Sequence, residues 1–351
     1  MTARAFRIDG RDVGGEAACY IIAEAGSNHD GDIDQAFRLI DVAAEAKADA
    51  VKFQVFSAET IASPAEIPIN RIDVAGAKSP FELFKGLEMP REWLPDLFAY
   101  ARDRGITFLA TPFDEAAVDQ LFDLGVSAFK VASFEINHFP MLARVAATGR
   151  PVLLSTGMAG LGDVEEAMAV LESNDCSEVA LFHCGIGYPM ELGDVNLRVM
   201  RTMKQAFECP VGYSDHTEGI TVPTAVVAMG GELIEKHFTV DRSLPGPDHP
   251  FALEPGELRD MVTAVRATEV AMGSRVKAAV ESELEFKRRG RRSLFAGKAI
   301  AAGTVIARDM IEVLRPGVGL HPRHLDAIVG RKASRHIQEH EPLSWDCFMT
   351  S

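Results

Sequence analysis

The sequence predicts an α/β protein, a (β/α)8 TIM barrel followed by a small C-terminal domain. Eight short apolar runs alternate with amphipathic helical stretches, which matches such a barrel of about 250 residues in count and size. Polar side chains stand where several runs end, and barrels of this kind carry their active sites at the C-terminal ends of their strands. The chain has 351 residues, of which 47% are hydrophobic, enough for one large core and a smaller one.

The expected strands are nearly continuous in hydrophobicity, as strands buried on both faces must be. They span residues 20–26, 50–56, 106–113, 128–133, 151–157, 179–185, 210–216 and 233–239. Amphipathic helices are expected over residues 34–46, 91–104, 114–124, 163–172, 196–207 and 254–268. Several of them open with Asp, Asn or Pro, which favour helix starts.

Three other segments complete the expected organisation. Residues 57–89, after the second strand, are too long for an ordinary βα loop, and such insertions usually carry function or cover a site. The barrel is expected over residues 1–273, and a charged stretch over 274–292 predicts a solvated linker. Residues 293–351 predict a domain of short strands and turns, too small to be very stable alone.

Composition narrows the function classes. The net charge of −15 argues against a nucleic-acid partner, because phosphate backbones are bound by excess Lys and Arg. It does not exclude an anionic substrate, since local lysines can still attract one. Five scattered cysteines without a C-x-x-C pair, and no apolar leader, predict a cytoplasmic protein with reduced thiols. No stretch approaches a membrane span in length, so no membrane association is expected.

Two histidines form the first candidate site. His216 and His237 stand at the ends of the seventh and eighth expected strands, so both should face one mouth of the barrel. Imidazole is a common ligand of Mn, Zn and Fe, and two ligands leave positions open for water or substrate, as Lewis-acid catalysis requires. Asp248 and His249 follow the eighth strand and could add to this site, and the alternative role for Asp248 is to cap a turn.

Two lysines form the second candidate site. Lys52 and Lys130 lie inside strongly apolar strands, where an unpaired charge is costly to bury. They either clamp a small dianion such as a phosphate or form ion pairs with Glu24, Glu135 or Glu235. A Schiff-base lysine is a third alternative. Hydroxyl groups placed to assist a dianion clamp belong to Thr111, Ser133, Ser155, Thr156 and Ser214.

Glu24 ends the first expected strand. A carboxyl group in apolar surroundings can hold a raised pKa and move protons near neutrality, and it can also pair with Lys52. Gln54 shares a strand face with Lys52, because side chains two residues apart point the same way.

A set of short motifs resembles the sialic acid synthase family, whose members condense phosphoenolpyruvate with an N-acetylated amino sugar. In order, the motifs begin with IAEAGSNHDG at residue 22, VKFQ at 51, TPF at 111, FKVASFE at 129, LSTGM at 154, SDHT at 214, EKHF at 235 and PGPDH at 245. In the tail, RRSL at residue 291, IAAGT at 300 and LRPG at 314 resemble that family's antifreeze-like (SAF) domain. Each motif alone is weak, but their joint order is specific.

The resemblance implies roles for these residues. It implies a divalent metal on His216 and His237, most commonly Mn²⁺, with Mg²⁺ or Co²⁺ as alternatives. It implies that phosphoenolpyruvate is held by Lys52, Thr111, Lys130, Ser133, Ser155 and Ser214. Glu24 and Glu135 would handle protons or the sugar, and Gln54, Tyr188 and Asp248 would bind substrate.

The resemblance also implies a reaction and an assembly. The product would be a nine-carbon 3-deoxy-2-ulosonic acid of the sialic type, formed with release of phosphate. The enzyme would be a domain-swapped homodimer, in which the SAF domain of one subunit caps the partner's barrel and supplies Arg315 to the acceptor sugar.

Two departures from the family pattern concern substrate recognition. Ile186 stands between two glycines where sialic acid synthases carry polar residues, and residues 57–89 match the family's acceptor loop poorly. Two alternatives therefore accompany an active synthase. One is a non-catalytic or altered paralogue that binds sugar or phosphate in surface or spore-coat polysaccharide assembly. The other is a 3-deoxy-heptulosonate synthase, against which the SAF-like tail argues.

Overall fold

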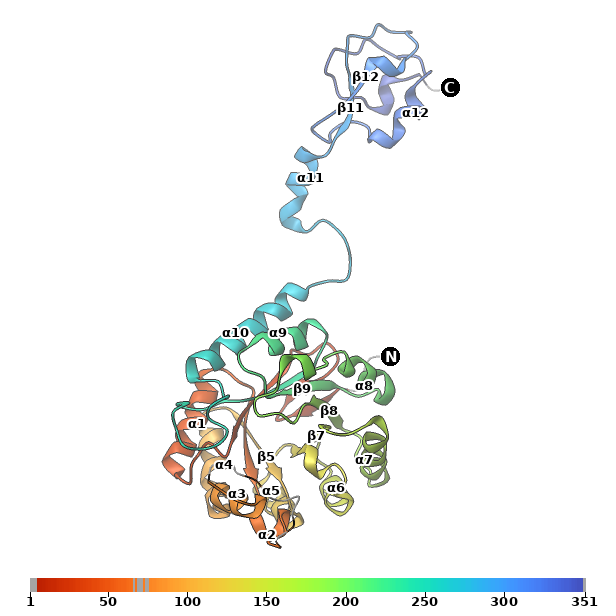
Figure 1. Ribbon diagram of the computed structural model, residues 1–351. Coiled ribbons are helices and arrows are strands. Elements are labelled where there is room, and N and C mark those ends of the chain that lie inside the picture. The colour runs from red at the N-terminus through yellow and green to blue at the C-terminus, as the bar shows by residue number, and fades with distance from the viewer. Residues whose placement is uncertain (1–4, 66, 68–71, 73–75, 350–351) are drawn as a thin grey trace. The chain divides into compact units, whose positions relative to one another are not determined.

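A computed structural model describes residues 5–65, 67, 72 and 76–349 (Figure 1). The chain divides into two compact units, Met1–Gly273 and Ser274–Ser351. The first unit is the expected barrel, in which eight parallel strands nearly close and helices lie outside them (Figure 1). The ladder runs in the order β5-β4-β3-β10-β9-β8-β7-β6. The predicted (β/α)8 fold is therefore confirmed.

All eight predicted strands are present, most of them shorter than expected by one to three residues. They are β3 (Tyr20–Gly26), β4 (Ala50–Val55), β5 (Thr107–Pro112), β6 (Phe129–Val131), β7 (Val152–Ser155), β8 (Val179–Cys184), β9 (Val211–Asp215) and β10 (Leu233–His237). The six predicted helices appear as α1 (Ile33–Glu45), α4 (Leu94–Asp103), α5 (Glu115–Leu124), α7 (Leu161–Ser173), α8 (Val199–Phe207) and α10 (Pro255–Met272).

Three elements of the barrel unit were not predicted. Helices α6 (Phe139–Ala146) and α9 (Thr221–Ala228) complete the outer ring. Each has only eight residues, and α9 is almost wholly apolar, so neither shows a long polar stripe. The third element is an antiparallel hairpin of β1 (Phe6–Ile8) and β2 (Arg11–Val13), whose buried apolar residues join the inner core of the barrel.

The long insertion after β4 contains two helices, α2 (Ala58–Ile61) and α3 (Pro80–Leu87). The remainder of the expected acceptor loop lies partly outside the described residues.

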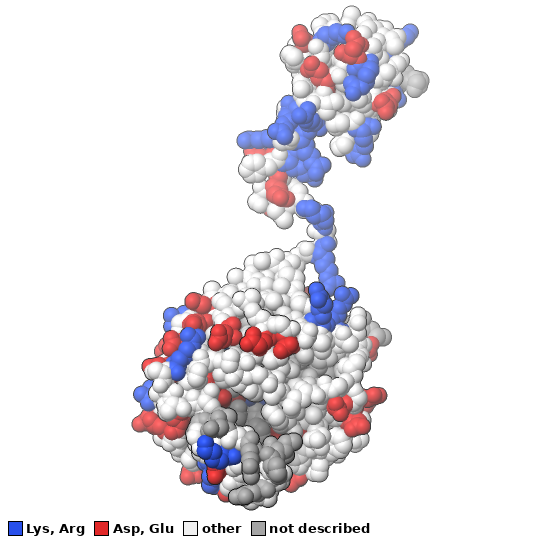
Figure 2. Space-filling model, in the orientation of Figure 1, with Lys and Arg blue, Asp and Glu red and all other residues white. Residues whose placement is uncertain are grey.

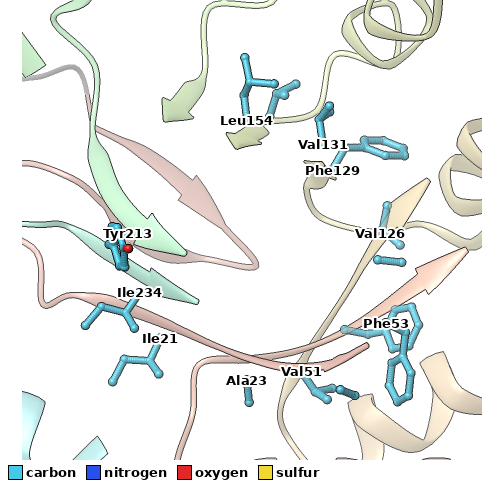
Figure 3. Packing of buried hydrophobic residues seen from close by; sticks show 14 of the residues in the cluster. Ile21, Ala23, Val51, Phe53, Val126, Phe129, Val131, Leu154, Tyr213 and Ile234 are labelled. Carbon is cyan, nitrogen blue, oxygen red and sulfur yellow. The ribbon is translucent and has the colours of Figure 1, made fainter. Parts of the chain in front are cut away.

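Strand side chains separate into two sets by their parity. One set faces the helices and is apolar, as Figure 3 shows for Ile21, Ala23, Val51 and Phe53. The other set faces the barrel interior, where Ile22, Ala50, Leu109, Ala128 and Leu153 form an apolar layer with the hairpin. Two residues further along each strand, the interior side chains are polar: Glu24, Lys52, Thr111, Lys130, Ser155, Ser214 and Glu235. The interior therefore changes from apolar to charged at the C-terminal end.

The second unit has its own small core. β11 (Ser293–Ala296) pairs antiparallel with β12 (Ile311–Leu314), and α12 (Leu325–Ile328) packs with them. Part of the segment expected as a linker is helical, as α11 (Leu284–Gly290). Lys and Arg side chains gather on α11 and the residues after it (Figure 2). The linker function itself stays a prediction.

All five cysteines are free and buried. Among the described residues, no helix is both long enough and apolar enough to cross a membrane.

One buried ion pair joins the ends of β9 and β10. Lys236 Nζ lies 2.7 Å from Asp215 Oδ2, and both side chains are 1% exposed. Lys236 also donates to the carbonyl of Thr217. Burial lowers the pKa of Lys236, and the carboxylate of Asp215 opposes that change. The neighbours of this pair in sequence, His216 and His237, are thereby held side by side.

Replacement of Lys236 with Met should lower the free energy of unfolding by about 3–5 kcal/mol, because the buried Asp215 carboxylate would lose its partner. Urea unfolding followed by circular dichroism measures this change. The matched control is Arg144→Met, which breaks a 2.6 Å ion pair with Asp119 between half-exposed side chains. That change should cost less than about 1 kcal/mol. Equal costs for the two variants would contradict the account.

Candidate active site

A cavity opens at the C-terminal ends of the barrel strands, and every strand contributes to its lining or is followed by a residue that does. Most of the predicted site residues line it: Glu24, Lys52, Gln54, Thr111, Lys130, Ser133, Ser155, Tyr188, Ser214, His216 and His237. Asp248 adjoins it, with Oδ2 at 3.7 Å from His237 Nδ1. Glu135 and Arg315 are not among the lining residues, and Arg315 belongs to the second unit.

The floor of the cavity is a network of four buried charges. Lys52 Nζ lies 2.7 Å from Glu24 Oε2 and 3.8 Å from Glu235 Oε2. Lys130 Nζ lies 3.7 Å from Glu235 Oε1. All four side chains are less than 7% exposed. The ion-pair alternative for the lysines is therefore observed, with Glu24 and Glu235 as partners.

Burial and pairing act in opposite directions on these charges. Burial alone would lower the pKa of Lys52, but Glu235 and Glu24 outweigh it and raise that pKa. Burial lowers the pKa of Lys130, and Glu235 only partly offsets it. Burial raises the pKa of Glu24 despite Lys52, whereas the two lysines overcome burial and lower the pKa of Glu235. Lys52 and Glu235 are accordingly the most firmly charged members.

Hydroxyl groups surround the lysines. Lys52 Nζ donates to Thr111 Oγ1 at 3.0 Å, and Lys130 Nζ donates to Ser155 Oγ at 2.5 Å. Ser214 Oγ donates to Glu235 Oε1 at 3.1 Å. The ammonium groups thus have partners that can also turn toward an incoming anion.

The two histidines stand above this floor as neutral imidazoles. Their ring centroids are 5.3 Å apart, and burial lowers the pKa of both. His216 Nδ1 donates to the carbonyl of Gly185 at 2.8 Å, so its Nε2 carries a free lone pair. His237 Nδ1 is buried and has no hydrogen-bond partner among the described residues.

This donor set fits a divalent metal with an open coordination shell. In the described part of the chain, no cluster of three or more His, Cys, Asp or Glu side chains is arranged around one metal position. An ion on the two histidines would therefore take water or substrate oxygens as its other ligands.

Ile186 forms an apolar part of the wall. It lines the cavity and packs against Gly157, where a Cβ atom would lie 2.6 Å from Ile186 Cδ1. Tyr188 also lines the cavity, with its ring centroid 4.3 Å from that of His216. The departure noted in the sequence thus changes the chemistry of the cavity wall.

Two carboxyl groups near the site have strongly raised pKa values. Glu135 follows β6 in a short 3-10 helix, Ser133–Glu135, and burial raises its pKa to about 7. Its Oε2 is buried and has no hydrogen-bond partner within the described ranges. Burial, assisted by Glu24, raises the pKa of Asp248 to about 7.

Some lining residues were missed as site residues. Glu235 was expected only as a partner for lysine, although its two-residue spacing from His237 places both on one strand face. Phe113, Phe134 and Cys184 also line the cavity, and their residue types offered no signal in the sequence.

Comparison with known proteins places the chain among sugar-acid synthases. Residues 39–277 match the NeuB family and residues 291–349 match the SAF domain. The chain is 39% identical to N,N'-diacetyllegionaminic acid synthase of Legionella pneumophila, over 95% of each chain. It is 35% identical to human N-acetylneuraminate-9-phosphate synthase, over 95% of this chain and 94% of that one. The crystal structure of spore coat polysaccharide biosynthesis protein SpsE from Bacillus subtilis is similar, with a TM-score of 0.68 and 41% identity over 99% of this chain and 100% of that one.

Replacement of Glu135 with Gln should change how stability depends on pH. The folded protein holds a proton on Glu135 up to about pH 7, whereas the unfolded chain releases it near pH 4.5. Wild type should therefore lose stability relative to Glu135→Gln as pH rises through this window, by on the order of 2 kcal/mol. Urea unfolding at several pH values measures the difference. A difference that stays constant across the window would contradict a buried, proton-holding Glu135.

Proposed function

The chain belongs to the NeuB family of phosphoenolpyruvate-dependent nonulosonic acid synthases, and we propose that it condenses phosphoenolpyruvate with an N-acetylated amino-hexose. The product is a nine-carbon 3-deoxy-2-ulosonic acid, and phosphate is released. One observation carries the proposal: two buried lysines with hydroxyl partners lie beneath two neutral histidines in one open barrel mouth.

The charged floor suits the anionic substrate. Lys52 and Lys130 would bind the phosphate and carboxylate of phosphoenolpyruvate while they stay beside Glu24 and Glu235. Their ammonium groups are already desolvated and held in place, so little reorganisation accompanies binding. Hydroxyl groups that would complete the anion site belong to Thr111, Ser133, Ser155 and Ser214.

The upper part of the cavity suits the acceptor. His216 and His237 would hold the metal on which this family generally depends, most commonly Mn²⁺. When bound, such an ion supplies Lewis-acid polarisation of a carbonyl group. Gln54, Tyr188 and Asp248 surround this position and would orient the open-chain sugar.

The bond changes of this reaction require proton transfers that carboxyl groups can carry out. A bond forms between C3 of phosphoenolpyruvate and the aldehyde carbon, water adds at C2, and phosphate leaves from C2. The attacking water becomes the C2 carbonyl oxygen and loses both of its protons. The aldehyde oxygen gains one of them and the departing phosphate gains the other. Glu24 and Glu135, whose pKa values are raised by burial, are suited to exchange these protons near neutral pH.

We also propose a domain-swapped homodimer. Apolar side chains before and within α11 are strongly exposed, with Val276 at 75% and Phe286 at 77%. Several strongly exposed apolar side chains in one short segment favour an interaction site there. A partner's SAF domain would cover the barrel mouth and bring its Arg315 to the acceptor. Phe286→Glu should shift dimer to monomer in analytical ultracentrifugation, and a monomeric wild type would contradict the assembly.

A second function is favoured by one observation. Ile186 gives an aliphatic wall that cannot hydrogen-bond a substrate, and the chain is 41% identical to a spore coat polysaccharide biosynthesis protein. A paralogue that binds sugar or phosphate without turnover would retain the charged floor. It would bind phosphoenolpyruvate and release no phosphate.

Purified protein with Mn²⁺ should release phosphate from phosphoenolpyruvate with one acceptor of a panel. The panel holds N-acetylmannosamine, its 6-phosphate, diacetamido hexoses and plain hexoses. Chelation of the metal, His216→Ala or His237→Ala should each reduce the rate at least about 100-fold, because the carbonyl loses its electrophilic assistance. Asp41→Asn, on the outer face of α1, is the control. Release that persists in both histidine variants would contradict the proposed metal site.

A further inference from the structure

A partly buried hydrogen-bond network joins the loop after β3 to the loop after β10. His249 is 0% exposed, and its Nε2 lies 3.0 Å from both carboxylate oxygens of Asp30, which is 219 residues away in sequence. Because a carboxylate accepts, His249 Nε2 carries the proton. On the other side of the ring, His249 Nδ1 lies 2.7 Å from Thr239 Oγ1. The imidazole is therefore held from both of its nitrogens.

The surroundings of this pair are closely fitted. Gln35 Nε2 donates to Asp30 Oδ2 at 2.8 Å and to the carbonyl of Asn28 at 2.6 Å, which orients the carboxylate. A Cβ atom added to Gly246 would lie 2.8 Å from Asp30 Oδ1 and 2.8 Å from His249 Cδ2. The backbone at Gly246 thus lies directly against the hydrogen-bonded pair, and any side chain there would force the two residues apart.

The hydrogen bond between His249 and Asp30 determines the position of Asp248. Asp248 directly precedes His249, and its Oδ2 lies 3.7 Å from His237 Nδ1. A Cβ atom on Gly26, whose φ is +54°, would lie 3.3 Å from the same oxygen. Asp248 is therefore fitted between β3 and β10 at the cavity edge, in a loop whose position depends on its neighbour.

We propose that His249 and Asp30 are positioning residues, which fix the 245–249 loop so that Asp248 meets the acceptor. Neither residue lines the candidate active-site cavity, whereas Asp30 lines an adjacent cavity together with Gly246. In this proposal both residues act through Asp248. This inference rests on the proposed function, because it gives Asp248 an acceptor to orient. The inference distinguishes the two substrates. Phosphoenolpyruvate would lie on Lys52 and Lys130, away from the 245–249 loop. Only acceptor binding would therefore depend on the hydrogen bond between His249 and Asp30.

The test compares Asp30→Asn, His249→Gln and Gly246→Ala with wild type. Each should raise KM for the acceptor by about tenfold, as loss of a supporting hydrogen bond does at other sites, and leave KM for phosphoenolpyruvate within about twofold. The double variant Asp30→Asn/His249→Gln should be no worse than the single ones, since both break one interaction. Asp41→Asn is the matched control, because it weakens a contact between α1 and Tyr100 of α4, distant from the cavity.

Hydrogen–deuterium exchange gives a readout that needs no turnover. In the three variants, amides of residues 28–31 and 245–249 should exchange faster, while those of β4 and β6 stay protected. Unchanged acceptor KM together with unchanged exchange would overturn the inference. So would an equal rise in both KM values with faster exchange throughout the barrel, which marks a general stabiliser. If wild type shows no turnover with any acceptor, the proposed function fails. The exchange pattern still decides whether the hydrogen bond between His249 and Asp30 fixes the 245–249 loop.

Discussion

Four charges held together inside an apolar barrel are the constraint on which the rest of the site depends. Glu24, Lys52, Lys130 and Glu235 occupy one layer, two residues along their strands from an interior packed with aliphatic and aromatic side chains. An isolated ion at such a depth is very costly, so each of these groups requires a partner from another strand. The register of the parallel ladder supplies those partners, because it sets which side chains meet across the interior.

The layer of four charges is closed at the N-terminal end of the barrel strands and open at their C-terminal end. The β1–β2 hairpin fills the N-terminal end with apolar side chains, so that water reaches the charges only from the mouth. At the mouth, the Lys236–Asp215 pair holds the strands that carry the two histidines. The His249–Asp30 pair holds the loop beside them. One ion pair and one hydrogen-bonded pair outside the cavity thus organise the groups inside it.

Much of this could be read from the sequence. The eight apolar runs predicted the strands, because strands buried on both faces are apolar throughout, and polar residues at their ends marked the site. The short helices α6 and α9 were not predicted, since eight residues show too little helical periodicity of apolar side chains. The sequence could not decide between an anion clamp and ion pairs for Lys52, because the choice depends on distances across the barrel. The structure shows ion pairs at the same lysines for which anion clamping is proposed. Asp30 and His249 lie in motifs that the sequence analysis did single out, but their contact joins chain segments 219 residues apart.

The central claim is that the charged floor is a preformed site for phosphoenolpyruvate. Isothermal titration calorimetry of phosphoenolpyruvate with the purified protein, without an acceptor, tests it most directly. The account predicts measurable binding by wild type that weakens at least about tenfold in Lys130→Met, since a charged hydrogen bond to the anion is lost. Binding of equal affinity in wild type and Lys130→Met, or no binding by well-folded wild type, would contradict it.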